Sequence, residues 1–187
     1  MIQDLPVLKA VANHEIYHAV QGAFESARNR VHPQSSTCAS TTRLIDDLYR
    51  EGTATFVEDI SLVNQSNSPA AARMRADMED GLKHPSWSAT LLEMSLISLR
   101  AKDAVPYDDV YSVGFYGHGP LYTIGYVMAR ELFDQRGASG ISDLLTQPSF
   151  RFILAYADLP LYGKDRDHPK LGPNTLAAAE SLASDCG

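Results

Sequence analysis

The chain has few cysteines, no cluster of basic residues and no long apolar run, and each absence excludes a class of protein. Its 187 residues include 2 cysteines, Cys38 and Cys186, and neither has the C-x-x-C spacing of a cysteine zinc site. They could form one disulfide in an oxidising compartment, and two unpaired thiols are the equal alternative. The net charge of -7 argues against nucleic acid and anionic membranes as partners. No apolar run reaches the length of a membrane span.

The N-terminus lacks the basic start and apolar run of a secretory signal. As the chain is written, a cytoplasmic location is therefore expected, and an extracytoplasmic one if an upstream signal peptide has been lost. The length and a hydrophobic content of 44% predict a single domain over residues 1–187 with a buried core. No pattern in the sequence indicates the oligomeric state.

The most informative residues present are His14-Glu15-Ile16-Tyr17-His18, which form an H-E-x-x-H motif. On a helix, positions i and i+4 share a face, so the imidazoles of His14 and His18 can converge on one metal ion. Glu15 lies one residue round the helix, where its carboxylate can reach a metal-bound water but is poorly placed as a ligand. Two neutral imidazoles and one carboxylate leave a fourth zinc position open, as in catalytic sites.

A helix is predicted around this motif, from about Leu5 to Phe24. Asp4 is expected as its N-cap, and Pro6 suits its first turn. The positions expected to be buried are apolar and have helical spacing: Leu8, Val11, Ala12, Ile16, Ala19, Val20, Ala23 and Phe24.

A third metal ligand is expected on a separate helix downstream, and Glu51 is the leading candidate. The small residues after it, Gly52-Thr53-Ala54, would let two helices approach closely enough to share one ion. The nearby acidic alternatives are Asp46, Asp47, Glu58 and Asp59. Glu58 and Asp59 are interpreted as a solvated helix face. Asp47 could orient a histidine ligand, although a solvated carboxylate is the favoured interpretation.

The rest of the chain is predicted to be mainly helical. Helices are expected at residues 41–63, 70–82, 86–99, 120–135, 139–146, 149–157 and 175–183. Polar residues and prolines predict loops at 29–40 and 159–174. Residues 102–119 are expected to form an ordered loop, with a short extended piece around residues 110–115.

The pattern His14-Glu15-x-x-His18 with Glu51-Gly52-x-Ala54 resembles the gluzincin clan of zinc metallopeptidases. The strings His-Glu-Ile-Tyr-His-Ala-Val-Gln and Gly-Pro-Leu-Tyr-Thr-Ile-Gly-Tyr-Val-Met-Ala are similar to an uncharacterised bacterial family of zinc-dependent peptidases. This resemblance covers roughly residues 10–160 and implies a mainly α, zincin-like helical metallopeptidase core. The clan's usual N-terminal sheet would be absent or minimal here, and an N-terminally truncated chain is the alternative.

The resemblance implies a function for the residues of the motif. His14, His18 and Glu51 would hold Zn²⁺, and Glu15 would act as general base on a zinc-activated water. The expected reaction is the hydrolysis of a peptide bond in a peptide or protein substrate. The alternative function is a zinc-binding but catalytically inactive binding or scaffold domain.

Peptide hydrolysis also needs a donor for the oxyanion besides the metal. Tyr122 and His118 are the candidates, because both lie near the start of the helix expected at residue 120. Tyr116 and Tyr126 are alternatives. Core packing is an equally good interpretation of Tyr122 and Tyr126.

Several other residues receive no role in this chemistry. His32, His84 and His168 each precede a proline in a predicted loop and are expected to be exposed. Trp87 is expected to anchor a core or a pocket, and Gly125 to lie in a close contact between helices.

Overall fold

The computed structural model describes residues 4–28, 36–117 and 119–184, and these residues form helices and turns without a strand. The expectation of a mainly α fold is confirmed. The elements are α1 (Leu5–Ala23), α2 (Glu25–Arg28), α3 (Ser36–Val57), α4 (Ile60–Val63), α5 (Pro69–Lys83), α6 (Pro85–Arg100), α7 (Tyr107–Gly114), α8 (Pro120–Arg136), α9 (Ser139–Ser142), the 3-10 helix η1 (Asp143–Thr146), α10 (Phe150–Ala157) and α11 (Pro173–Ser184).

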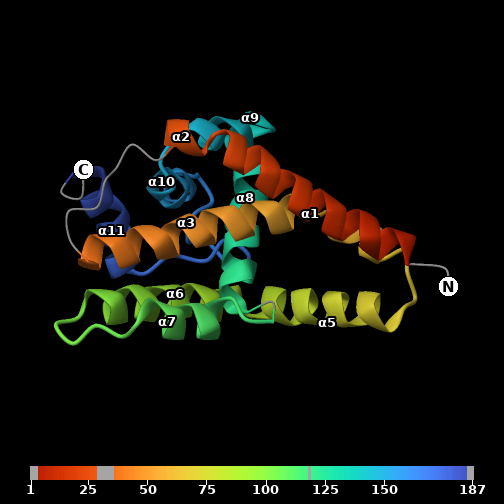
Figure 1. The fold of residues 1–187 in the computed structure, drawn as a ribbon, viewed down its shortest axis with the longest axis horizontal. Helices are drawn as coiled ribbons and strands as arrows, with labels where there is room; N and C mark the ends of the chain where they lie inside the picture. Colours follow the sequence, from red (N-terminus) through yellow and green to blue (C-terminus); the bar gives the residue numbers. More distant parts are fainter. Residues whose placement is uncertain (1–3, 29–35, 118, 185–187) are drawn as a thin grey trace.

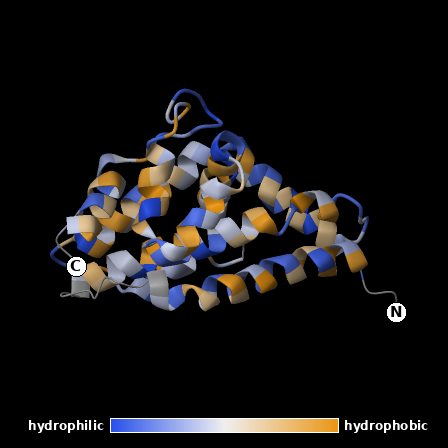
Figure 2. Ribbon diagram, turned by 90° about the horizontal axis from the view of Figure 1, so that it is seen from above, coloured by the Kyte–Doolittle hydropathy of each residue, from blue (hydrophilic) through white to orange (hydrophobic). Residues whose placement is uncertain are grey.

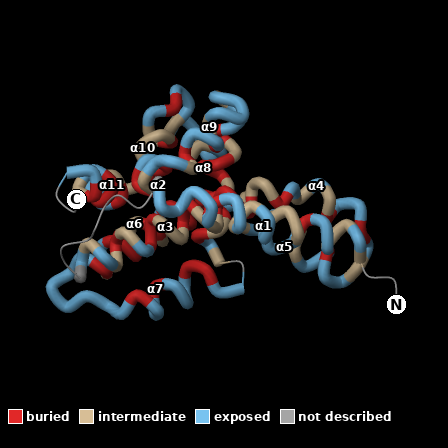
Figure 3. The backbone as a smooth tube through the Cα atoms, turned by 45° about the horizontal axis from the view of Figure 1, so that its top comes forward, coloured by how far each residue is buried: buried red, intermediate tan, exposed pale blue. Residues whose placement is uncertain are grey.

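Helix α8 crosses the other long helices and holds them together. In Figure 1 helix α8 runs steeply and passes behind α3. Helix α1 lies toward its upper end, and α5, α6 and α7 lie toward its lower end. Figure 3 shows buried segments of α3, α6, α8, α10 and α11 in red. The core formed there includes the fully buried side chains of Leu44, Leu48, Tyr49, Leu92, Leu96, Ile124, Met128, Phe152 and Tyr156.

The closest approach between two helices joins α3 to α8 at Gly52 and Gly125. A Cβ atom added to Gly125 would lie 2.6 Å from the Cα of Gly52, and one added to Gly52 would lie 2.5 Å from the carbonyl carbon of Gly125. The two backbones therefore touch, which confirms the close contact expected at Gly125. The small residue after Glu51 brings α3 against α8, whereas the sequence pattern suggested an approach to the motif helix.

Helix α1 forms where expected but turns the opposite face inward. Asp4 caps it, with its side chain accepting a hydrogen bond from the backbone N–H of Val7 at 3.4 Å. The expectation that its large apolar residues are buried is wrong. They are 37–63% exposed: Leu8, Val11, Ile16, Val20 and Phe24.

The inward face of α1 carries the fully buried Ala10 and Gln21 and both motif histidines. Figure 2 shows hydrophobic residues in orange along the length of α1, the helix beside the N-terminus.

In the described ranges no helix is long and apolar enough to cross a lipid bilayer.

The helix predicted at 41–63 is divided in two. It begins earlier, at Ser36, so the predicted loop at 29–40 is wrong for its last residues, and residues 29–35 lie outside the described part. It ends at Val57 because Asp59 adopts the left-handed backbone conformation, with φ of 58°. The Asp59 side chain then accepts a hydrogen bond from the N–H of Ser61 at 3.1 Å and starts α4.

The expected extended piece near residue 110 is instead the helix α7. Tyr107 and Val110 are both buried and are one helical turn apart. Asp108 and Asp109 lie in the first turn, where carboxylates stabilise the positive end of the helix dipole. The remaining helices agree with their predicted bounds to within a few residues.

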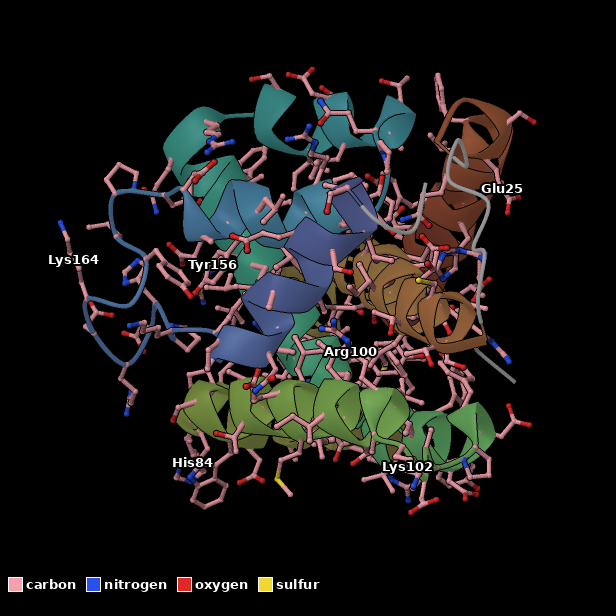
Figure 4. The ribbon with its side chains drawn as sticks, turned by 90° about the vertical axis from the view of Figure 1, so that its left-hand side faces the viewer. Glu25, His84, Arg100, Lys102, Tyr156 and Lys164 are labelled. Carbon is pink, nitrogen blue, oxygen red and sulfur yellow. The ribbon has the colours of Figure 1, made fainter. Side chains whose placement is uncertain are left out.

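Two residues outside the main core differ from expectation. His168 is mostly buried, because its imidazole pairs with Glu131 at 2.8 Å and with Asp165 at 2.7 Å. These contacts hold the loop that follows α10 against α8. Figure 4 labels Tyr156 in α10 and Lys164 in this loop. Trp87 is 69% exposed and so is not a core residue, but it lines a surface cavity together with His84, on whose ring it stacks at 4.0 Å.

The described residues contain no free cysteine. Cys38 in α3 is half-buried, packs against the core and is disulfide-bonded. Cys186, the partner that the sequence suggests, lies outside the described residues.

Candidate metal centre

Three potential metal ligands from two helices meet between α1 and α3. His14 and His18 project from one face of α1, and their Nε2 atoms are 3.0 Å apart. The Oε2 atom of Glu51 on α3 lies 3.4 Å from the Nε2 of His14 and 3.5 Å from that of His18. The structure thus brings together the three residues that the sequence suggested as ligands.

The spacing of these three atoms fits zinc. Bonds of about 2.0–2.1 Å at tetrahedral angles place ligand atoms about 3.3–3.4 Å from one another. The observed separations of 3.0, 3.4 and 3.5 Å lie around this value. Two imidazoles and one carboxylate are also a donor set of catalytic zinc sites, which leave a position open for water. Both the geometry and the chemistry of the donors therefore suit this metal.

The other nitrogen of each imidazole also has a partner. The Nδ1 of His18 lies 2.8 Å from the Oε1 of Gln21. The Nδ1 of His14 lies 3.3 Å from the Oε2 of Glu58. Such contacts fix the orientation of a ligating histidine and favour the tautomer whose Nε2 is free to bind metal.

The solvated position expected for Glu58 is therefore wrong, since this residue is buried beside His14. α3 ends just before it, and the chain turns the carboxylate inward. Asp59 is exposed, as expected. Asp47 is half-buried and accepts a hydrogen bond from the Tyr107 hydroxyl, so neither interpretation of Asp47 describes its contact. Burial raises the pKa of Asp47, and the Tyr107 hydrogen bond opposes this effect.

The three clustered groups shift one another's pKa values strongly. Burial lowers the pKa of His14, but hydrogen bonds to Glu51 and Glu58 outweigh it and raise the pKa to about 9. A hydrogen bond to Glu51 raises the pKa of His18 against the effect of burial. Burial raises the pKa of Glu51, yet hydrogen bonds to both histidines bring it down to about 2. Without metal, the neighbouring imidazoles thus favour the ionised form of the Glu51 carboxylate.

The residues that the sequence suggested for catalysis differ in their exposure and in what they contact. Glu15 is exposed on α1 beside the ligand His14. Tyr122 is half-buried, and its ring packs edge-on against Phe115 at 5.5 Å. Burial raises the pKa of Tyr122, and the charge of Glu51 and a hydrogen bond to it raise it further. Tyr122 therefore touches both the core and the ligand cluster.

The other residues that the sequence suggested as oxyanion donors are His118, Tyr116 and Tyr126. His118 lies outside the described residues. Tyr116 is 84% exposed, and Tyr126 packs against the ring of Phe56 at 6.3 Å, in keeping with a packing role.

Two residues near the ligands, Gln21 and Tyr111, were not identified from the sequence, and Glu58 was named there only as an acidic residue of a solvated face. Gln21 follows His18 by one turn, and Glu58 follows Glu51 by two turns, so helical spacing could have placed each on the ligand face. Tyr111 is close enough to Glu51 for that charge to add to the effect of burial in raising its pKa. No signal marked Tyr111, because α7 was expected to be a loop.

Comparison with known proteins finds one family. The chain matches, over residues 1–160, the family described as "Putative zinc dependent peptidase (DUF5700)". The matched range contains the whole ligand cluster, and zinc is the metal that the description names. No curated protein and no solved structure matches the chain.

Proposed function

The chain belongs to this family of "putative zinc dependent" peptidases, and from that premise we propose that it is a metallopeptidase of the gluzincin type. The observation that carries the proposal is the meeting of His14, His18 and Glu51 at separations that suit tetrahedral zinc. Zinc held by these residues would supply a Lewis acid that lowers the pKa of a bound water to about 7. The substrate would be a peptide or a protein.

Glu15 is the proposed general base. Its exposed carboxylate follows the ligand His14 directly on α1. An ionised carboxylate there can accept a proton from the attacking water and pass it to the nitrogen of the leaving amine. The presence of a carboxylate at this position favours an enzyme, because a purely structural zinc site has no use for it.

Tyr122 is the proposed donor to the developing oxyanion. Its raised pKa keeps the phenol protonated at neutral pH, so it can donate a hydrogen bond without carrying charge. The contact with Glu51 keeps its hydroxyl at the ligand cluster. Transition-state stabilisation by such donors is commonly the largest single contribution to catalysis.

The test compares Glu15→Gln with wild type on a mixed peptide library. Glutamine keeps the shape but cannot take a proton, so we expect hydrolysis to fall by about 10²–10⁴-fold. Zinc content, measured by elemental analysis, should stay unchanged. Glu79→Gln, an exposed glutamate on α5, is the matched control and should hydrolyse like wild type.

A chelator should abolish the wild-type activity, and added zinc should restore it. Equal hydrolysis by wild type and Glu15→Gln would contradict the proposed base. A wild-type protein that binds zinc and cleaves no peptide would instead favour the zinc-binding scaffold.

A further inference from the structure

Gln21 is a polar side chain that is fully buried next to the ligand cluster. It lies on α1, one turn after His18, and is 0% exposed. Its Oε1 atom is 2.8 Å from the Nδ1 of His18. Its Nε2 donates to the backbone carbonyl of Arg50 at 3.1 Å and to the Oγ1 of Thr53 at 2.8 Å. Both polar ends of the amide are therefore paired, one with a ligand and the other with α3.

The contacts on α3 fix which way the amide points. The carbonyl of Arg50 can only accept a hydrogen bond, so it must face the amide nitrogen of Gln21. The hydroxyl of Thr53 donates to the carbonyl of Tyr49 at 2.7 Å, which leaves its oxygen to accept from the same nitrogen. Gln21 is thereby held with its oxygen toward His18.

This orientation determines the tautomer of His18. An amide oxygen can only accept, so the Nδ1 of His18 must carry the hydrogen and donate it. In a neutral imidazole the Nε2 then keeps its lone pair, and this atom is the one that faces His14 and Glu51. The chain of hydrogen bonds runs from the α3 backbone through Gln21 to the Nδ1 of His18, whose ring carries the metal-binding Nε2.

We propose that Gln21 is the positioning residue of the metal centre, which orients His18 and sets the register of α1 against α3; this rests on the zinc site of the proposed function. Its α3 partners, Arg50 and Thr53, flank Glu51 closely in sequence, so the same contacts relate His18 to the carboxylate ligand. A neutral amide achieves this without a further negative charge beside Glu51 and Glu58.

The test is Gln21→Met, which preserves length and volume but removes the hydrogen bonds. The zinc Kd is measured by competition with a chromophoric chelator, and the visible absorption spectrum of the Co²⁺-loaded protein reports ligand geometry. We expect zinc affinity to fall by about 10–100-fold, the usual effect of losing such a partner. The cobalt bands should change in intensity or position.

The control is Thr175→Val, which removes a buried hydroxyl that donates to Glu93 at 2.8 Å, away from the cluster. It should lower the melting temperature while the zinc Kd and cobalt spectrum stay as in wild type. If Gln21→Met lowers the melting temperature but likewise leaves both zinc readouts unchanged, Gln21 is a core residue only and the proposal is overturned.

A second variant covers the case in which Gln21→Met does not fold. Thr53→Val removes one acceptor of the Gln21 amide and leaves the glutamine in place, so zinc affinity should fall by about tenfold at the lower end of that range. An unchanged Kd would overturn the proposal. None of these readouts uses hydrolysis, so a protein that binds zinc but cleaves no peptide would contradict the proposed function alone. A wild type that binds no zinc would overturn both.

Discussion

Replacing Gly52 with alanine tests the helix contact on which the ligand cluster is built. A methyl group at Gly52 would lie 2.5 Å from the carbonyl carbon and 2.9 Å from the carbonyl oxygen of Gly125. Both neighbours are backbone atoms of α8, so no side chain can rotate away to make room. Helices α3 and α8 would have to separate, and the packing of their fully buried side chains Leu48, Ile124 and Met128 in the core would loosen.

The size of the effect follows from two opposing terms. Overpacking a core costs typically 1–3 kcal/mol, and a rigid backbone contact places Gly52→Ala at about the upper end. Alanine regains about 1 kcal/mol over glycine through its helix propensity. The net loss of unfolding free energy is therefore about 2 kcal/mol, which in a chain of this size lowers the melting temperature by about 4–8 °C.

Urea unfolding of the metal-free protein measures this loss, and Gly22→Ala is its matched control. Gly22 is also helical, but apart from its chain neighbours and the backbone of its own helix, no atom lies within 4 Å of an added Cβ. It should gain about 0.5–1 kcal/mol from alanine. Gly52→Ala should also weaken zinc binding, since Glu51 moves with α3. Equal stabilisation by the two substitutions would refute the α3–α8 contact described here.

Three further predictions concern the site. Glu51→Ala should weaken zinc binding far more than Asp47→Ala, because Asp47 contacts Tyr107; the reverse order would refute the ligand assignment. In the metal-free protein the raised pKa of His14 stabilises the fold below pH 6.5, and this contribution is lost as pH rises to about 9. Zinc must displace that proton, so calorimetry should show zinc affinity rising with pH up to about 9; a flat profile would contradict this. Tyr122→Phe should lower kcat by about 10²–10³-fold at unchanged zinc content, whereas lost stability with normal kcat would assign Tyr122 to packing.

The ligand cluster was the part of the molecule most open to prediction. The spacing of His14 and His18 needs only a helix, and the surrounding sequence from Asp4 onward supplies the cap and first turn of one. Glu51 could be selected because it lies on a second helix and is followed by a glycine. What the sequence could not specify was the helix that meets this glycine, since contact between α3 and α8 depends on the whole arrangement of the core.

Local backbone conformation caused the errors at the end of α3 and in α7. A left-handed Asp59 has no strong sequence signal, since aspartate adopts that conformation only in particular contexts. Glu58, the residue before it, contacts His14 although it was interpreted as part of a solvated helix face. In α7, the valines and aromatic residues of residues 110–115 favoured an extended piece, whereas Tyr107 and Val110, one helical turn apart, are both buried in the helix that forms.

The inverted face of α1 has a physical cause that hydrophobic periodicity cannot detect. Periodicity assigns the apolar stripe to the interior because a buried polar group without a partner is costly. That cost disappears where the polar groups satisfy one another, and His14, His18 and Gln21 each have partners on α1 or α3. The polar face can then be buried, and the apolar stripe around Ile16 remains outward. A helix that carries metal ligands is thus a place where periodicity alone misidentifies the buried face, because the site supplies the partners that burial demands.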